Sequence, residues 1–379
     1  MVKKIQSLAL NSSPRGLIAG NYCHDVLIKD DVVIAESLGG AASFISALLD
    51  GLSIPVDYVC KVGPDFRYQV NHKPLVSYSC ETTVFHAYFC EESTRNDRVL
   101  KRVGSCDPIF ASDLPDVRFD FGMAVGVGGE IVPETLEKMV NICNVVFVDI
   151  QALIRVFDPV DGTVSLVNLK DTGFYRLLPR IGFLKASAEE ALFMDLEEVR
   201  KWCCVVVTNG KEGCTVYWKD AELKVSPFPT VQVDPTGAGD SFLGGLVAGL
   251  VQGLVVQDAA LLGNLFGSLT VSHIGLPKLD FRLFEEVRSE VQRRKMQCMN
   301  RSQRHDEEDQ FTKPVGHEQF LLSLRAVKSM YTCPVQASEG ETPSSTKVDL
   351  GNSLHCTGQQ KLLLNTMYKE PIKTVETNP

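Results

Sequence analysis

A glycine-rich turn, an aspartate and a long apolar segment follow one another in this chain, and together they constrain its fold more than any other feature. Residues 233–245 read VDPTGAGDSFLGG. Gly237 and Gly239 let the backbone approach a ligand closely, and the apolar residues 242–256 predict a buried helix. The free N–H groups at the start of such a helix suit a phosphate group. The sequence therefore predicts an anion site beside the carboxylate of Asp240.

A carboxylate next to a phosphate site is electrostatically unfavourable unless it has a chemical role. Asp240 is placed to accept the proton of a hydroxyl group that attacks the phosphate, which is general base catalysis. The same letters also fit an ordinary turn in which an aspartate caps a helix. The coincidence of turn, anion site, carboxylate and helix start favours the catalytic interpretation.

The segment 233–245 closely resembles the C-terminal signature of the ribokinase-like (pfkB) carbohydrate kinases. The resemblance covers about residues 17–277, and it implies that ATP, together with Mg²⁺, donates a phosphoryl group. It also implies that Asp240 is the catalytic base and that the turn before it is the anion hole. The residues of this turn that it assigns to nucleotide binding are Thr236, Gly237, Ala238 and Gly239.

Composition excludes several other classes of function. The chain has 379 residues, of which 44% are hydrophobic and 22% charged, and its net charge of −9 leaves no broad basic surface for nucleic acid. Its 12 cysteines are scattered without a CxxC pair, so we expect reduced thiols in a cytoplasmic protein. The N-terminus lacks the apolar core of a signal peptide, and residues 242–256 are too short and too rich in glycine to span a membrane.

Two further kinds of site find no support in the residue spacing. The histidines show no i,i+4 spacing with other ligands, so a histidine-based metal site is not indicated. No GxxxxGK[ST] run occurs, which argues against a P-loop kinase.

Short β-rich runs alternate with amphipathic helical patterns. This alternation predicts βαβ units and a mostly parallel sheet that helices cover on both faces. The resemblance implies the same architecture, a ribokinase-like three-layer α/β/α sandwich with a small β lid. The expected strands are residues 17–20, 58–62, 121–127, 145–149, 182–184 and 205–208, and the expected helices are residues 42–49, 133–143 and 188–202.

Two segments interrupt this alternation. Residues 25–36 read as two short strands and residues 81–91 as another, and we expect them to form a small sheet of their own. The resemblance implies a lid that excludes water from the substrate. It also implies that such strands can form homodimer contacts, which leaves the oligomeric state open. Surface hairpins without a gating role are the alternative.

The chain changes character after residue 277. Residues 281–296 predict a last surface helix, whereas residues from 300 onward are polar and lack periodicity. We therefore expect a kinase domain over residues 1–297 and a polar, flexible extension over residues 298–379.

The N-terminal half contains residues suited to a polyhydroxylated acceptor. Gly39 and Gly40 precede a helix and let the backbone approach a ligand, and the carboxylate of Asp25 can accept hydrogen bonds from two neighbouring hydroxyls. The resemblance assigns substrate binding to this aspartate and, more weakly, to Asn21. The family normally has an asparagine where Ser43 stands, so the acceptor need not be a common furanose. A structural turn and an exposed loop aspartate are the alternative interpretations.

Two segments resemble nucleotide-binding parts of the family. Ser187 and Glu190 stand where the family has Asn-x-x-Glu, and Glu190 would hold a water on Mg²⁺, although a capping box explains the same letters. The turn with Thr208, Gly210 and Gly213 either contacts ATP or is a simple hairpin.

Two further polar residues complete the expected site. Asn264 lies among apolar residues of a helix that flanks the adenine in the family, although its amide also fits a packing role. The resemblance also implies a monovalent cation, K⁺, near Asp234 and the turn 272–275.

These observations predict ATP-dependent phosphorylation of a polyhydroxylated small molecule. Residues 38–44 and 127–130 are similar to those of the inositol-phosphorylating members of the family, which implies myo-inositol as the acceptor and its 3-hydroxyl as the position. Residue chemistry alone does not separate a cyclitol from ribose, fructose or adenosine. Another kinase of the family and a non-catalytic regulatory paralogue therefore remain alternatives.

Overall fold

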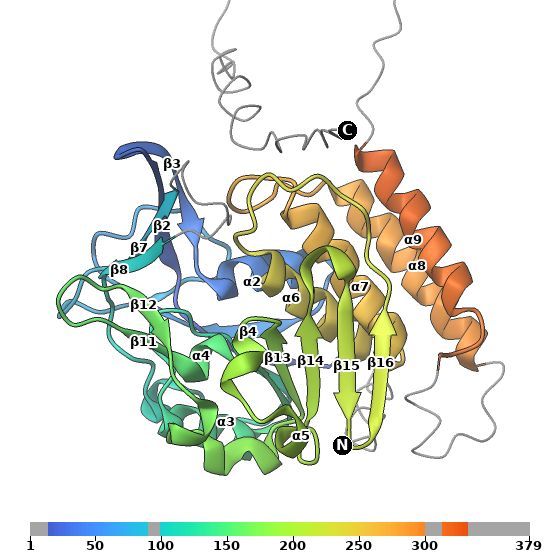
Figure 1. The fold of residues 1–379 in the computed structure, drawn as a ribbon, viewed down its shortest axis with the longest axis horizontal. Coiled ribbons are helices and arrows are strands. Elements are labelled where there is room, and N and C mark those ends of the chain that lie inside the picture. Colours follow the sequence, from blue (N-terminus) through green and yellow to red (C-terminus); the bar gives the residue numbers. More distant parts are fainter. Residues whose placement is uncertain (1–13, 90–98, 300–312, 333–379) are drawn as a thin grey trace, which may run out of the picture. The chain divides into compact units, whose positions relative to one another are not determined.

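An eight-stranded sheet with the order β16-β15-β14-β13-β10-β9-β1-β4 lies at the centre of the fold (Figure 1). The strands from β14 to β4 are parallel, and β15 and β16 extend one edge in antiparallel fashion. The predicted, mostly parallel sheet is thereby confirmed. The strands are β1 Gly16–Ala19, β4 Val56–Val59, β9 Phe119–Ala124, β10 Cys143–Asp149, β13 Phe183–Ser187, β14 Cys204–Thr208, β15 Cys214–Trp218 and β16 Ala221–Val225.

The computed structural model describes residues 14–89, 99–299 and 313–332. The chain divides into two units, Met1–Tyr331 and Thr332–Pro379, and the account below concerns the first. Within the described residues, no helix is both long and apolar enough to cross a membrane.

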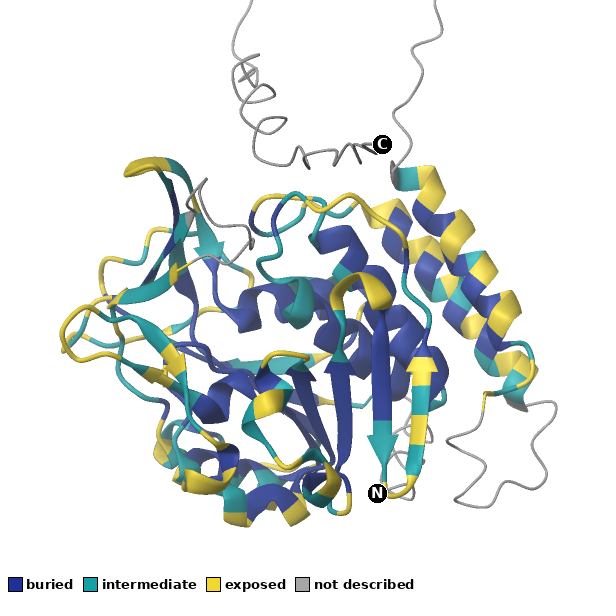
Figure 2. Cartoon of the chain, viewed as in Figure 1, coloured by how far each residue is buried: buried dark blue, intermediate teal, exposed yellow. Residues whose placement is uncertain are grey.

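Helices cover both faces of the sheet because side chains alternate along the strands. On β10, Val145 and Phe147 belong to one core cluster, and Val146 and Val148 belong to another. Figure 2 shows the buried strands between the two helical layers, which confirms the predicted three-layer sandwich. The first face is covered by α2 Ala41–Gly51, α6 Ala238–Val251, α7 Val256–Thr270, α8 Phe281–Met299 and α9 His317–Thr332, and the second by α3 Pro133–Ile142, α4 Gln151–Ile154 and α5 Leu196–Val199.

One predicted helix is wrong. Residues 188–202 do not form one amphipathic helix but a 3₁₀ turn, η4 Glu190–Phe193, followed by the short α5. The side chain of Asp195 accepts a hydrogen bond of 3.1 Å from the N–H of Glu198 and caps α5. This cap begins a new helix within the segment and so separates it from the turn before it.

A second, four-stranded sheet has the order β3-β2-β7-β8, and we call it the small sheet. It confirms that the two segments that interrupt the alternation pair with each other, since β2 runs parallel to β7 and antiparallel to β3. Strand β8 was not predicted, and residues 90 and 91 lie outside the described residues. The strands are β2 Cys23–Lys29, β3 Val32–Gly39, β7 Thr83–Phe89 and β8 Val99–Gly104.

Two further strand pairs complete the described strands, one parallel and one antiparallel. Strands β5 Lys61–Val62 and β6 Leu75–Val76 form one pair. Strands β11 Arg155–Phe157 and β12 Val164–Leu166 form the other, which a bridge between Lys101 and Thr163 joins to β8.

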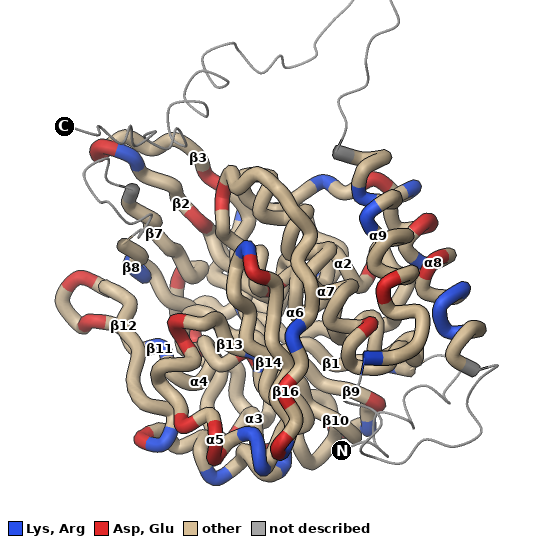
Figure 3. Tube along the Cα trace, turned by 45° about the vertical axis from the view of Figure 1, so that its right-hand side comes forward, with Lys and Arg blue, Asp and Glu red and all other residues tan. Residues whose placement is uncertain are grey.

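The expectation of a polar, flexible extension is wrong for residues 313–332, the part of it that the structure describes beyond α8. Helix α9 lies within residues 298–379, yet Phe320, Leu321, Leu324 and Val327 on it are buried in the core cluster that also contains α7 and α8. Figure 3 shows charges of both signs along α8 and α9, and such polar faces outweigh a narrow apolar stripe in a composition-based prediction. Residues 333–379 lie outside the described residues.

A buried charge cluster attaches α8 and α9 to α7. Asp258 on α7 is fully buried, and its two carboxylate oxygens contact Arg294 Nε and His317 Nδ1, each at 2.7 Å. Arg294 also donates to the carbonyl of Val315 at 2.9 Å. Since charges are costly to bury unless they are paired, this cluster specifies where α9 packs.

We predict that Arg294→Met lowers the free energy of unfolding by about 3–5 kcal/mol, because it leaves the carboxylate of Asp258 buried without its guanidinium partner. The neighbouring Arg293 pairs with Glu290 at the surface, so Arg293→Met should cost less than about 1 kcal/mol. Urea unfolding of both variants measures the difference, and equal costs would contradict this role of the cluster.

Candidate active site

The predicted anion site forms the start of α6. Gly237 is the N-cap of this helix in a left-handed conformation, with φ 75°. A side chain here would overlap the ring of Phe44 on α2. A Cβ on Gly239 would lie 2.8 Å from Lys185 Nζ on β13. The backbone of the turn therefore packs between α2 and the sheet, with a buried cation next to it.

The carboxylate of Asp240 stands in the first turn of α6, half-buried. Gln151, which follows β10, donates a hydrogen bond of 3.0 Å from Nε2 to Asp240 Oδ1. Burial raises the pKa of Asp240, while Lys185, Arg155 and this hydrogen bond counteract the rise. The pKa of Asp240 therefore lies above the ordinary aspartate value, and Gln151 orients the carboxylate.

Lys185 connects the carboxyl ends of β10 and β13. Its Nζ lies 3.0 Å from Oδ2 of the fully buried Asp149 and 4.0 Å from Glu190 Oε2. Burial alone would lower the pKa of Lys185, but neighbouring carboxylates, above all that of Asp149, outweigh burial and raise it. Burial also raises the pKa of Asp149, against the attraction of Lys185. The result is a fixed positive charge beside the anion site.

Ser187 and Glu190 form the capping box that the sequence left as an alternative. The N–H of Ser187 donates to Glu190 Oε2 at 2.8 Å, and the N–H of Glu190 donates to Ser187 Oγ at 3.1 Å. The pKa of Glu190 is lowered because Lys185 and these contacts outweigh burial. The capping role does not exclude a role toward a ligand, since Glu190 lies beside the Lys185 amine.

The residues expected to bind the acceptor meet where the small sheet joins α2. A side chain on Gly39 would overlap the carboxylate of Asp25, and Gly40 has φ 87° with the carbonyl of Asn21 against it. Ser43 donates from Oγ to the carbonyl of Gly40 at 2.7 Å and is buried. The structure therefore brings all five predicted residues together.

Asn21 makes hydrogen bonds within the protein that the sequence did not predict. Its side-chain oxygen accepts a hydrogen bond of 2.7 Å from the N–H of Lys61, and its own N–H donates to Glu130 Oε1 at 2.8 Å. The buried Glu130 also accepts hydrogen bonds from the N–H groups of Val127 and Gly128. The contacts of Glu130 join the carboxyl ends of β1 and β9, and the hydrogen bond from Lys61 gives the side chain of Asn21 a structural role.

The other predicted residues occupy positions at the same edge of the sheet or on α7. Thr208, Gly210 and Gly213 form the turn between β14 and β15, which confirms the hairpin. The amide of Asn264 donates to the carbonyl of Ser226 at 2.9 Å, which is the packing role considered as an alternative. Their contacts with a nucleotide stay predictions.

Asp234 precedes the anion site and lies beside the chain that follows α7. Its Oδ1 accepts hydrogen bonds from the N–H and Oγ1 of Thr236, at 2.9 and 2.6 Å. Its own N–H donates to the carbonyl of Val271 at 3.2 Å, next to the turn 272–275. The two segments expected to hold a cation are therefore neighbours.

Sequence reasoning missed four residues around Asp240, namely Asp149, Gln151, Arg155 and Lys185. A signal for two of them was present, because a charged residue in or at the end of an apolar strand needs a buried partner. The pairing of Asp149 with Lys185 could not be predicted, because more than thirty residues separate the two in the sequence.

Comparison with known proteins identifies the family. The model of the pfkB family of carbohydrate kinases matches residues 164–278. Inositol 3-kinase of Arabidopsis thaliana is 64% identical over 309 residues, which are 81% of this chain and 88% of that enzyme. Inositol 3-kinase of Zea mays is 50% identical over 306 residues, 75% and 80% of the two chains. This chain belongs to the pfkB family of carbohydrate kinases.

The fold agrees with this family. A solved pyrophosphate-dependent kinase of the ribokinase family, in complex with sulfate, superposes with a TM-score of 0.60 at 17% identity. The match covers 69% of this chain and 97% of that kinase. The ribokinase-like fold is thereby confirmed, and as a family member the chain is an ATP-dependent kinase that works with a divalent metal ion.

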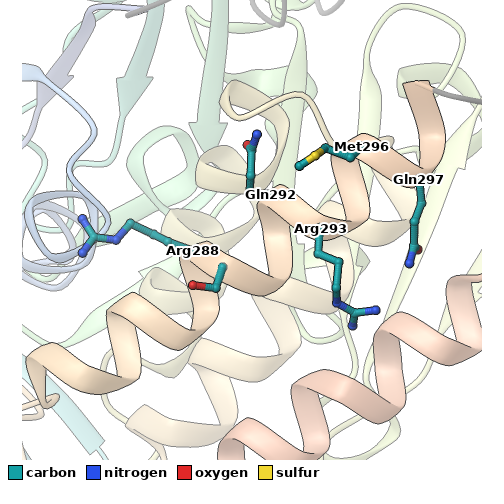
Figure 4. A pocket seen from close by; sticks show the side chains of 6 residues that line it. Arg288, Gln292, Arg293, Met296 and Gln297 are labelled. Atoms are coloured by element: carbon teal, nitrogen blue, oxygen red, sulfur yellow. The ribbon is translucent and has the colours of Figure 1, made fainter.

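Two hollows differ in their relation to the site of this kinase. One of about 540 Å³ lies on α8, and all its lining residues come from this single helix (Figure 4). The other, of about 730 Å³, is lined by residues that include Gly129 and Arg155. Arg155, which lines the second hollow, also acts electrostatically on Asp240. Among the residues that the structure describes, no group of three or more His, Cys, Asp or Glu side chains could hold a metal ion.

We predict that Gly237→Ala destabilises the kinase more than Gly210→Ala does. Both glycines have positive φ, which costs an alanine about 1–2 kcal/mol. Only at Gly237 would the new methyl group overlap another side chain, that of Phe44, whereas nothing lies within 4 Å at Gly210. Overpacking should add about 1–3 kcal/mol. Urea unfolding compares the two, and equal losses would contradict the close packing of the turn.

Proposed function

We propose that this chain phosphorylates myo-inositol on its 3-hydroxyl with ATP as the donor. The identity to two plant inositol 3-kinases over most of both chains supports the acceptor. The observation that carries the chemistry is the position of Asp240, which Gln151 orients in the first turn of α6 next to Lys185.

In this proposal, Asp25 and the backbone of Gly39 and Gly40 hold the acceptor through its vicinal hydroxyls. Asp240 accepts the proton of the attacking hydroxyl as its oxygen forms a bond to the γ-phosphorus and the bond to the β–γ bridging oxygen breaks, which releases ADP. The N–H groups at the start of α6 and the charge of Lys185 stabilise the negative charge of the transferred group.

Glu190 is the residue suited to Mg²⁺ through a water. Among the described residues, its contacts with Ser187 and Lys185 both use Oε2, which leaves Oε1 for a water of a largely hydrated ion. Bound Mg²⁺ would neutralise the charge of the donor phosphates. A monovalent cation, K⁺, is proposed at Asp234 because this residue adjoins the turn 272–275.

The small sheet is proposed as the lid of this site. It carries Asp25 on β2 and ends at Gly39 on β3, so its movement would open and close access to the acceptor. We place the kinase in the cytoplasm, because the cysteines within the described residues are free thiols. A homodimer through the small sheet stays a proposal.

The experiment that tests the acceptor measures phosphorylated product with a panel of myo-inositol, ribose, fructose and adenosine. Each is offered with ATP and, in parallel, with pyrophosphate, because the structurally similar kinase uses pyrophosphate. We expect the highest kcat/KM for myo-inositol with ATP, and NMR of the product to place the phosphate on the 3-position. Faster turnover of another acceptor would overturn the proposed substrate.

We predict that Asp240→Asn lowers kcat by a factor on the order of 10²–10⁴, because the amide cannot accept the proton. The affinity for ATP should stay close to that of the parent, as measured by calorimetry. The control is Asp220→Asn in an exposed turn, for which kcat should not change. An Asp240→Asn variant with parental kcat would refute the assignment of the base.

We predict that Gln151→Leu moves the acid limb of the pH–rate profile to higher pH. Turnover requires ionised Asp240, so activity falls as the pH drops through its pKa. The hydrogen bond from Gln151 lowers this pKa against burial, and its loss must raise the pKa. The profile of kcat/KM against pH measures the shift, with Gln292→Leu on the exposed side of α8 as the control. An unmoved acid limb would contradict the orienting role of Gln151.

A further inference from the structure

Two cysteines lie in contact at the base of the small sheet. Cys80 precedes β7 and Cys106 follows β8, and their Sγ atoms are 2.9 Å apart. This separation exceeds the length of a disulfide bond by roughly 0.9 Å. Both side chains are partly exposed, so a small oxidant has access to them.

The backbone around the two cysteines holds their sulfur atoms in place. The N–H of Cys106 donates to Thr83 Oγ1 at 3.1 Å, and the N–H of Asp107 donates to Cys80 Sγ at 3.2 Å. Burial and the hydrogen bond with Cys80 raise the pKa of Cys106 to about 12. The sulfur of Cys80 accepts the backbone hydrogen bond from Asp107, so we assign the first reaction to Cys80 and the second to Cys106.

This cysteine pair is linked to the acceptor side of the site. The carboxylate of Asp107 accepts hydrogen bonds from Ser77 and Ser79 at 2.5 and 2.6 Å. Its backbone carbonyl accepts one of 3.5 Å from the amide of Asn21, which lies between β1 and β2. A covalent bond between the two sulfur atoms would therefore fix the base of the small sheet next to the residues that precede β2.

We propose that Cys80 and Cys106 form a peroxide-sensitive dithiol whose disulfide restrains the small sheet. The Cys80 thiolate attacks one oxygen of hydrogen peroxide, the O–O bond breaks, and the other oxygen leaves as water once protonated. The sulfur of Cys106 then attacks the sulfenic sulfur of Cys80, loses its proton, and a second water leaves. Two thiols are thus oxidised to one disulfide, and one peroxide is reduced to two waters.

The disulfide has a consequence for turnover that rests on the proposed function, whereas its formation does not. If the small sheet opens to release the product, a bond between the chain before β7 and the chain after β8 slows that opening. We expect kcat to fall severalfold on oxidation and to return on reduction.

The first test measures the disulfide itself on the full, reduced chain titrated with hydrogen peroxide and then alkylated. Peptide mapping without reductant should show a peptide pair that joins residues 80 and 106 and that disappears with dithiothreitol. The thermal midpoint should rise by several degrees in the parent and not in Cys106→Ser. Cys298 has a comparable exposure and serves as the reference. If Cys80 and Cys106 are both still alkylated at peroxide concentrations that already oxidise Cys298, the proposal is overturned.

The variants separate the two roles and the consequence for turnover. Dimedone should label Cys80 in Cys106→Ser but not Cys106 in Cys80→Ser, and the reverse pattern would refute the assigned order.

The double variant Cys80→Ser/Cys106→Ser should keep the kcat of the reduced parent under peroxide, with Cys298→Ser behaving like the parent. A disulfide that forms without any change in kcat would overturn the restraint. A chain that turns over no acceptor would refute the proposed function while the peptide map still decides the disulfide.

Discussion

The buried ion pair between Lys185 and Asp149 is the interaction on which the site depends. It joins the carboxyl end of β10 to the middle of the adjacent parallel strand β13. The amine and the carboxylate oxygen are 3.0 Å apart and almost without solvent. A charge in such a place is stable only with its partner. Because the same amine lies against Gly239 and near Glu190, the pair places a positive charge where the donor phosphates would arrive. Lys185 also acts electrostatically on Asp240, which links the start of α6 to the sheet.

Close backbone contacts make this arrangement possible. At Gly237 the turn approaches the ring of Phe44 so closely that no side chain fits, and at Gly239 it lies against the amine of Lys185. At Gly39, strand β3 approaches the carboxylate of Asp25 on the neighbouring strand β2. Gly237 and Gly239 therefore let elements from distant parts of the chain meet at one edge of the sheet, where ligands of parallel α/β folds bind. Gly39 lets two neighbouring strands of the small sheet approach each other. The site is an outcome of three such approaches rather than of one motif.

The fold and part of the site could be predicted from the sequence because their signals are local. The alternation of strands and helices, the turn 233–245 and the capping box at Ser187 each depend on neighbouring residues. The prediction of one helix over residues 188–202 was wrong because the cap at Asp195 divides this segment. Helix α9 was missed because its apolar stripe becomes stable only against α7 and α8, through the charge cluster at Asp258.

The sequence by itself determined the family, the type of fold and the glycine turn that ends in the carboxylate of Asp240. Only the tertiary structure decided that Lys185, Asp149 and Gln151 surround Asp240. It also decided that the side-chain oxygen of Asn21 accepts a hydrogen bond from the N–H of Lys61, and that α9 packs in the core. The physical reason is that a buried charge or amide is recognisable in a sequence by its cost, but its partner is chosen by the packing of strands and helices that are far apart along the chain.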